Sequence, residues 1–118
     1  MSQVKVVRLE THGRDLPLTV HGGRATALLR PEVGCHQRTL IRFDLPSGTA
    51  TIPLAHPGKE AVYYVLSGQG QVADPDSGQP QPLRPGLFVY LTPGQRYRFE
   101  GPLVVVGGPC PTDPALFE

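Results

Sequence analysis

Short apolar runs alternate with turns rich in glycine and proline along most of the chain. The runs consist of β-branched and aromatic residues and have the length of single strands. Such runs at regular intervals are typical of an all-β sandwich or barrel. We expect strands at residues 4–9, 25–30, 38–45, 62–66, 87–91, 96–99 and 103–106. No segment of helical length carries an apolar stripe with a period of 3.6 residues, so the pattern predicts almost no helix.

Two segments show the strand pattern and its turns most clearly. In the run 38–45, Thr39 and every second residue after it should face the core. Arg38 and Arg42 then point outward, toward solvent or a subunit interface. The sequence Pro75-Asp-Ser-Gly78 predicts a hairpin turn between two extended segments, because proline presets φ and glycine accepts a positive φ.

The two ends of the chain are predicted to behave differently. Residues 4–9 form an apolar strand ahead of the barrel proper, and an uncovered edge strand needs a partner. We therefore expect a homodimer. Residues 109–118 contain three prolines and should be irregular, either packed on the barrel through Leu116 and Phe117 or frayed. The whole chain, 1–118, is then a single domain with a barrel core at about 25–108.

Composition narrows the functional classes. A chain of 118 residues fits one modest core. The formal net charge is +1 and the basic residues are scattered, so we expect no nucleic-acid partner. No apolar run is long enough to span a membrane, and the first residues lack an apolar signal segment, so we expect a cytoplasmic protein. Cys35 and Cys110 make no disulfide framework and are expected to be idle thiols, although whether either is reactive stays open.

The segment 48–68 carries the most information about family. Gly48 and Gly68 bracket it, Leu54 and His56 lie two residues apart, and Ala61 follows five residues after the histidine. The spacing resembles the first signature of the cupin family, G-x5-H-x-H-x3–4-E-x6-G. In that comparison His56 is the second histidine of the signature. Leu54 replaces the first histidine and Ala61 replaces the glutamate.

The segment 86–101 resembles the second cupin signature, G-x5-P-x-G-x2-H-x3-N. Gly86 and Gly94 are kept, whereas Thr92 replaces the proline, Tyr97 the histidine and Gly101 the asparagine. The resemblance covers about residues 46–101. It implies a double-stranded β-helix, the jelly-roll barrel of cupins, joined between its signatures by a short loop.

The resemblance also implies where a metal would bind, and three of those four ligand positions are changed. Leucine and alanine cannot ligate a metal, and a tyrosine ligates only as a phenolate, whose ordinary pKa is about 10. We therefore expect no metal and no other cofactor. Glu60 would restore a ligand only if a bulge turned it inward, because Ala61 occupies the inward register and adjacent strand residues point to opposite faces.

His56 and Tyr97 are the candidate catalytic residues. Tyr97 lies between Arg96 and Arg98, which should face outward, so its hydroxyl should face His56 across the pocket. An imidazole titrates near neutrality and can act as a general base, and a phenol can donate a proton or orient a ligand. The alternative is that the tyrosine ring fills the space left by the metal and that His56 is structural. The residues expected to line the pocket are Leu54, Glu60, Tyr63 and Phe99, with Phe88 or Tyr90 as a further aromatic wall.

Three functions remain open. The first is a metal-independent cupin that binds a small molecule and acts as an acid/base isomerase, epimerase or cyclase through His56 and Tyr97. The second is a non-catalytic cupin that binds or senses a ligand or has a structural role. The third is an atypical metal-dependent enzyme that uses His56 and Glu60. An open pocket favours the first and a filled barrel favours the second.

Overall fold

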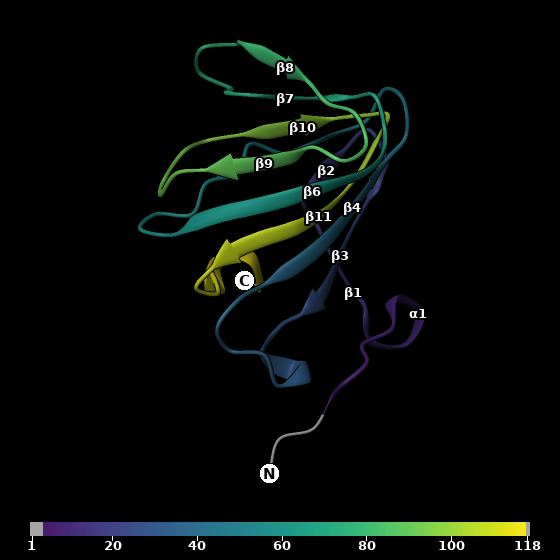
Figure 1. The fold of residues 1–118 in the computed structure, drawn as a ribbon, viewed down its shortest axis with the longest axis vertical. Coiled ribbons are helices and arrows are strands. Elements are labelled where there is room, and N and C mark those ends of the chain that lie inside the picture. Colours follow the sequence, from purple (N-terminus) through teal and green to yellow (C-terminus); the bar gives the residue numbers. More distant parts are fainter. Residues whose placement is uncertain (1–3, 118) are drawn as a thin grey trace.

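The computed structural model describes residues 4–117 and shows an all-β jelly roll, as predicted (Figure 1). One sheet has six strands in the order β1-β3-β4-β11-β6-β9, and the other has five in the order β2-β5-β10-β7-β8. The strands are β1 (Arg14–Leu16), β2 (Thr19–Val20), β3 (Arg24–Leu29), β4 (Leu40–Leu45), β5 (Ala50–Thr51), β6 (Glu60–Gly68), β7 (Gln71–Ala73), β8 (Pro80–Pro82), β9 (Phe88–Leu91), β10 (Arg98–Glu100) and β11 (Leu103–Cys110). The described helical segments are α1 (Leu9–His12) and two short 3₁₀ helices, Pro31–Val33 and Pro114–Phe117. None of them is long and apolar enough to cross a membrane.

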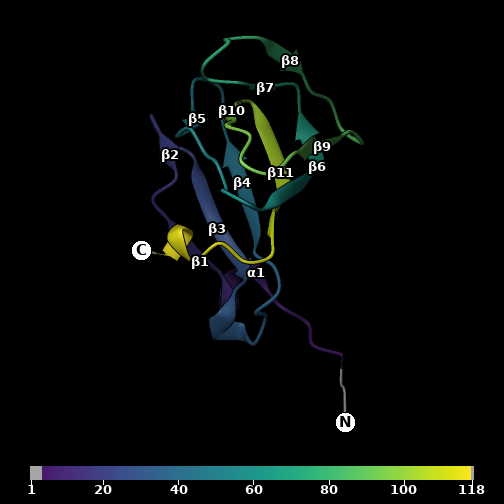
Figure 2. The same cartoon turned by 90° about the vertical axis from the view of Figure 1, so that its left-hand side faces the viewer.

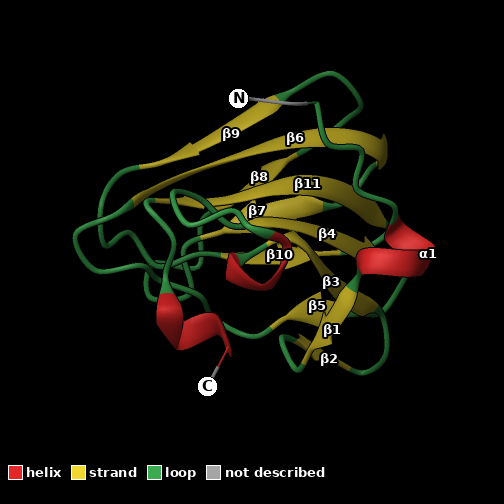
Figure 3. Cartoon of the chain, turned by 90° about the horizontal axis from the view of Figure 1, so that it is seen from below, coloured by secondary structure: helices red, strands yellow, loops and turns green. Residues whose placement is uncertain are grey.

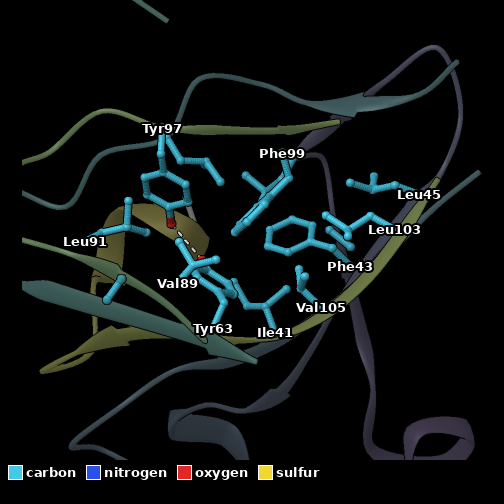
Figure 4. Close-up of a cluster of buried hydrophobic side chains, with 14 of the residues drawn as sticks. Ile41, Phe43, Leu45, Tyr63, Val89, Leu91, Tyr97, Phe99, Leu103 and Val105 are labelled. Atoms are coloured by element: carbon cyan, nitrogen blue, oxygen red, sulfur yellow. Dashed lines mark hydrogen bonds between the residues drawn. The ribbon is translucent and has the colours of Figure 1, made fainter. Parts of the chain in front are cut away.

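The core lies between the two sheets and follows the alternation of the strands. On β4, Ile41, Phe43 and Leu45 are buried, as the pattern predicts, and Thr39 just before the strand is buried with them. Phe43 reaches across to Phe99 of β10, with 6.1 Å between the ring centroids. Figure 4 shows this cluster, in which side chains from both sheets point toward one another. Burial of this apolar surface is the main force that holds the sheets together.

The prediction of an N-terminal strand at residues 4–9 is wrong. Residues 4–8 adopt no regular structure, and residues 9–12 form the single turn of α1. Val4 and Val6 are exposed, so their alternation with polar residues reflects no buried face. The turn of α1 is favoured locally because the Arg8 backbone N–H donates to Nδ1 of His12, at 3.0 Å. The first strand is β1, which the sequence pattern missed.

The C-terminal region is more ordered than predicted. β11 continues past residue 106 to Cys110, pairing with β6 at Gly107, Gly108 and Pro109. A side chain at Gly107 would meet the Val62 carbonyl at 1.9 Å, so glycine permits the strands to approach there. Beyond the strand, the packing predicted for the tail is confirmed, because Leu116 is buried in the core cluster and Phe117 packs partly against it. Figure 3 shows this C-terminal turn at the end of the sandwich where β6 begins and β9 ends.

The hairpin predicted at residues 75–78 is confirmed and forms the edge of the five-stranded sheet. β7 and β8 pair as antiparallel neighbours, and the Gly78 N–H donates to the Asp74 carbonyl at 2.8 Å. The edge strand β8 has the sequence Pro-Gln-Pro, and all three residues are exposed. The opposite sheet ends at β9, so the described strands form two sheets rather than one closed barrel (Figure 2).

Candidate functional site

His56 is held in the loop between β5 and β6 by bonds to its backbone. Two residues earlier, Leu54 forms an isolated antiparallel bridge with Tyr97, through N–H to carbonyl bonds of 2.8 and 2.9 Å. The His56 carbonyl accepts from the N–H groups of Lys59 and Gly94 at 2.9 and 3.2 Å. Because extended residues two apart point to the same side, this bridge turns both His56 and Tyr97 toward the interior.

Four buried side chains then form a continuous polar network. His56 Nδ1 lies 2.7 Å from Asp113 Oδ2, and His56 Nε2 lies 2.7 Å from the Tyr97 hydroxyl. The Tyr97 hydroxyl in turn lies 2.6 Å from the hydroxyl of Tyr63 (Figure 4). His56 is only 3% exposed and Tyr97 only 1%. We call Asp113, His56, Tyr97 and Tyr63 the buried polar network.

The contacts of Asp113 set the direction of the hydrogen bonds. Its Oδ1 accepts the Ala115 N–H at 3.1 Å, so both carboxylate oxygens have partners. An ionised carboxylate can only accept, so with His56 in its neutral form Nδ1 is the donor and Nε2 the acceptor. Tyr97 therefore donates its O–H to His56 Nε2, and Tyr63 donates to Tyr97.

The phenols of this network are held in their neutral form. Burial raises the pKa of Tyr63 well above its ordinary value. Burial raises the pKa of Tyr97 further, and the nearby Tyr63 and the negative charge of Asp113 add to the effect. A phenol of this kind is a poor acid by itself. The Tyr97 hydroxyl is in hydrogen-bond contact with the ring of His56.

Asp113 is the residue of this network that the sequence analysis missed. It lies 57 residues from His56, in a tail expected to be irregular. Its one local signal is capping, because an aspartate before Pro114 can bond the N–H two residues on, as it does with Ala115. That signal predicts the turn, but it cannot show that the other carboxylate oxygen reaches His56.

The structure brings together most of the other residues predicted to line the pocket, but they pack against one another as part of the core. Leu54, Tyr63 and Phe99 are buried around Tyr97. The Phe99 ring lies edge-on to both tyrosines, at centroid distances of 4.9 Å to Tyr63 and 5.7 Å to Tyr97. These rings therefore fill the barrel next to His56.

Glu60 lies away from this site. Ala61 takes the inward position of β6, as the motif spacing predicts, and Glu60 is exposed on the opposite face. Its carboxylate accepts the Tyr90 hydroxyl at 2.8 Å. The bulge that would turn Glu60 inward is absent from its end of β6, because the pairing with β11 runs without a shift from Val105 to Cys110. Phe88 and Tyr90 are exposed and lie on the outer face of β9, while Val89 and Leu91 point inward, so the two aromatic residues border the cavity described below but form no wall between the sheets.

A cavity of about 480 Å³ lies beside the network, between β9 and the β7–β8 hairpin. Tyr97 is one of its lining residues and is almost completely buried. Its apolar lining includes Leu83, Val89 and Leu91. Polar groups around it are Asp74, Ser77, Gln79, Gln81, Gln95 and Arg96. Figure 2 shows the two borders, the β7–β8 hairpin and β9.

The residues present do not fit a metal site. Nowhere between residues 4 and 117 do three or more His, Cys, Asp or Glu side chains gather as metal ligands would. Both ring nitrogens of His56 already have partners. Cys35 and Cys110 are free and half-buried, with their Sγ atoms near the backbone carbonyls of Arg38 and Gln37.

Comparison with known proteins places this architecture. Residues 41–106 match the sequence pattern of the Cupin domain family. No curated protein gives a significant match. Among solved structures, a predicted oxalate decarboxylase from Thermotoga maritima is similar with a TM-score of 0.74 and 21% identity, covering 91% of this chain and 99% of that one.

Two further similar structures are described as enzymes. A nucleoside dehydratase from Streptomyces has a TM-score of 0.73 and 17% identity, covering 93% of this chain and 84% of its own. The polyketide cyclase RemF from Streptomyces resistomycificus has a TM-score of 0.62 and 21% identity, covering 93% and 80%. At these identities the likeness shows the fold alone.

Proposed function

The chain belongs to the cupin family, and we propose that it binds a neutral polar small molecule and moves a proton on it without a metal. His56 and Tyr97 are the reacting pair. The observation that carries the proposal is the double position of Tyr97, which lines the cavity and lies 2.7 Å from His56 Nε2 through its hydroxyl. The reaction class is an acid/base one, an isomerisation, epimerisation, cyclisation or elimination.

The charges around the cavity support a neutral ligand. Its lining has one carboxylate, Asp74, and one guanidinium, Arg96. Arg96 is already paired with Asp76. Asp74 is bonded by the backbone N–H of Asp76, which lowers the pKa of its carboxyl, and by the side chain of Gln95. No unpaired charge of the lining is therefore available to hold a phosphate or carboxylate. The amides of Gln79 and Gln81 can both donate and accept, which suits hydroxyl and carbonyl groups.

The proton step follows from the direction of the network. The Tyr97 oxygen takes a proton from the ligand while its own O–H proton passes to His56 Nε2. His56 becomes an imidazolium that the Asp113 carboxylate stabilises, and Tyr97 ends as a neutral phenol. Return of a proton to a different atom, or to the other face of the same atom, completes the reaction. Acid/base assistance of this kind contributes about 10²–10⁴ to a rate.

The similar structures add support from chemistry. Structures of the nucleoside dehydratase with uridine carry Tyr→Phe substitutions at two tyrosines that lie 34 residues apart. Tyr63 and Tyr97 are also 34 residues apart. A further structure of that enzyme with uridine carries a His→Gln substitution. Histidine and a tyrosine pair are thus the groups tested in that protein, and the same residue types meet in the buried polar network here.

A non-catalytic role is the second candidate, and the close packing around Tyr97 favours it. Tyr63, Tyr97 and Phe99 are almost completely buried, so the network can serve to dock the tail. The two candidates differ in whether ligand protons exchange.

The first experiment is an NMR titration with uridine as a neutral probe and uridine 5′-monophosphate as its charged counterpart. We expect uridine to shift the amide signals of Val89, Leu91 and Tyr97, and the monophosphate to bind at least tenfold more weakly. A set of neutral sugars and nucleosides then identifies the tightest binder. If none of these compounds shifts the cavity signals at millimolar concentration, neutral-ligand binding is contradicted.

The second experiment follows deuterium uptake by that binder in D₂O by mass spectrometry. We expect Tyr97→Phe and His56→Gln to reduce the uptake rate by 10²-fold or more. Tyr90→Phe is the matched control, because Tyr90 also lines the cavity but lies outside the network. Binding without protein-dependent uptake would favour the non-catalytic candidate.

A further inference from the structure

The outer face of the six-stranded sheet carries an apolar surface that the site does not explain. β6 presents Val62, Tyr64 and Leu66 there, and β9 presents Phe88 and Tyr90. Phe88 is 71% exposed and Tyr90 is 58% exposed. We call these five side chains the β6–β9 apolar face.

The strand register joins these side chains into one surface. Val62 is paired with Tyr90 and Tyr64 with Phe88. The rings of Tyr64 and Phe88 lie 4.8 Å apart, which is a packed aromatic contact at the surface. Val106 of β11 lies opposite Tyr64 on the other side and extends the row. The surface is therefore continuous across three strands.

The size of this surface is that of a binding face. From their exposed fractions and the usual areas of such side chains, the five together expose roughly 450 Å². This area lies within the range of about 300–600 Å² for the largest apolar patch of a typical monomer, a patch that often has a function. A stable interface takes about 800 Å² from each partner, and the flanking residues of β11 and β4 on the same face can supply the remainder.

We propose that a second copy of this chain packs on the β6–β9 apolar face, sheet against sheet, about a two-fold axis. In such a dimer the same patch serves both copies, so it must complement itself. The five side chains carry no charge, and a flat apolar surface meets that requirement. Toward β4 the rim holds Arg42 and Asp44, which pair with each other at 3.1 Å and so do not repel a copy.

The ends of the face favour one orientation. Glu60 lies at the start of β6 and accepts the Tyr90 hydroxyl. Arg84 lies in the turn before β9, which bonds to β6 through the Gly86 N–H and the Val65 carbonyl at 3.0 Å. A two-fold axis across the strands brings the Glu60 end of one copy over the Arg84 end of the other, so opposite charges meet.

The dimer would also border the cavity. Phe88 and Tyr90 belong both to the β6–β9 apolar face and to the cavity lining. A second copy seated on them closes the outer side of β9 and restrains the wall that the ligand contacts. The proposal itself rests on the exposed face alone and does not require the proposed reaction.

Sedimentation equilibrium of the full chain tests the proposal, over 1–100 µM protein. We expect a mass twice the 12.7 kDa of the chain. Phe88→Asp and Leu66→Asp place a charge in the apolar contact and should each raise the dissociation constant at least about 100-fold. Both residues are well exposed in the single chain, so the variants should keep the wild-type circular dichroism spectrum. Val20→Asp is the matched control, because Val20 is an exposed strand valine on β2, 37% exposed and off this face. It should leave the mass unchanged.

Charge exchange tests the orientation. Glu60→Arg and Arg84→Glu should each weaken the dimer, and the double variant should restore it. A monomeric wild type at 100 µM would overturn the proposal. A dimer insensitive to both Phe88→Asp and Leu66→Asp would overturn it as well, and so would a dimer lost on Val6→Asp, which would assign pairing to the N-terminal segment.

Discussion

Tyr63 and Tyr64 are neighbours on β6 and lie in opposite environments. Tyr63 points between the sheets, is 1% exposed, and bonds through its hydroxyl to Tyr97. Tyr64 points outward, is 38% exposed, and packs its ring on Phe88. One face of β6 supports the buried polar network, and the other is exposed.

The comparison teaches that residue type alone does not decide a role in this strand. Both faces of β6 are apolar, so a simple alternation of apolar and polar residues does not separate inside from outside. What distinguishes the two faces is whether another element of the protein packs against them. The inner face meets Phe99 and Tyr97 of the opposite sheet, whereas among the described residues no element covers Tyr64 and Leu66.

The sharpest way to test this contrast is to truncate each tyrosine. Tyr63→Ala leaves a cavity the size of a ring in the core and should lower the free energy of unfolding by about 3–5 kcal/mol. Tyr64→Ala should lower it by less than about 1 kcal/mol when measured on the monomer. Urea unfolding followed by circular dichroism measures both. Equal losses would show that the outer face is as fully packed as the inner one.

Alkaline titration separates the same two faces by protonation. Because burial raises the pKa of Tyr63 and Tyr97, the folded protein keeps both phenols protonated after the unfolded chain has begun to release them near pH 10. Their contribution to stability is therefore complete below pH 10 and is lost as the pH rises above it. The loss should be about 1.4 kcal/mol per pH unit for each buried phenol.

Absorbance at 295 nm gives the direct measurement. Of the four tyrosines, the exposed Tyr90 should ionise while the protein remains folded, although its hydrogen bond to Glu60 raises its pKa above the ordinary value. Tyr63 and Tyr97 should ionise only with unfolding. Four phenols ionising before the circular dichroism changes would contradict the buried polar network.

Removing the carboxylate tests the end of the network. Asp113→Ala leaves the Nδ1–H of His56 without its acceptor inside the protein and should lower the free energy of unfolding by about 1–3 kcal/mol. Asp113→Asn keeps an acceptor oxygen and should recover most of the loss. Nitrogen-15 NMR of the imidazole should show Nδ1–H in the wild type and a mixture of tautomers in Asp113→Ala. An unchanged tautomer would show that Asp113 does not orient the ring.

The smallest effect comes from removing single hydroxyls. Tyr63→Phe takes one donor from the Tyr97 oxygen and should lower the free energy of unfolding by about 1 kcal/mol. Tyr64→Phe should change it by no more than about 0.5 kcal/mol, because that hydroxyl is at the surface. Urea unfolding of the two variants in parallel gives the difference between faces with the ring volume kept.

The fold could be predicted from the sequence to a large extent because turn residues and strand alternation are local signals. The β4 register and the hairpin at residues 75–78 follow from such signals, the inward position of Ala61 follows from the spacing of the cupin signature, and the structure confirms all three. The strand expected at residues 4–9 does not form, because strand propensity without a partner strand does not make a sheet. Val4 and Val6 have the right residue types but no neighbour.

The site could be predicted only in part. The facing of His56 and Tyr97 follows from the two cupin signatures, since both positions point into the barrel. Asp113 could not be predicted because the contact joins a strand loop to a tail with no periodic pattern. The cavity could not be predicted either, because its position depends on rings such as Tyr97 and Phe99 filling the space between the sheets and leaving room beside β9.

The prolines of β8 limit which strands can pair with this edge of the five-stranded sheet. Pro80 and Pro82 have no N–H, so β8 cannot offer a regular ladder to any strand that approaches it. β9 therefore cannot form a regular ladder of backbone hydrogen bonds with β8, which would close the cavity next to Tyr97. The same absence of donors keeps another molecule from adding a strand at this edge. The two prolines thus keep this one edge of the five-stranded sheet from pairing with a further strand.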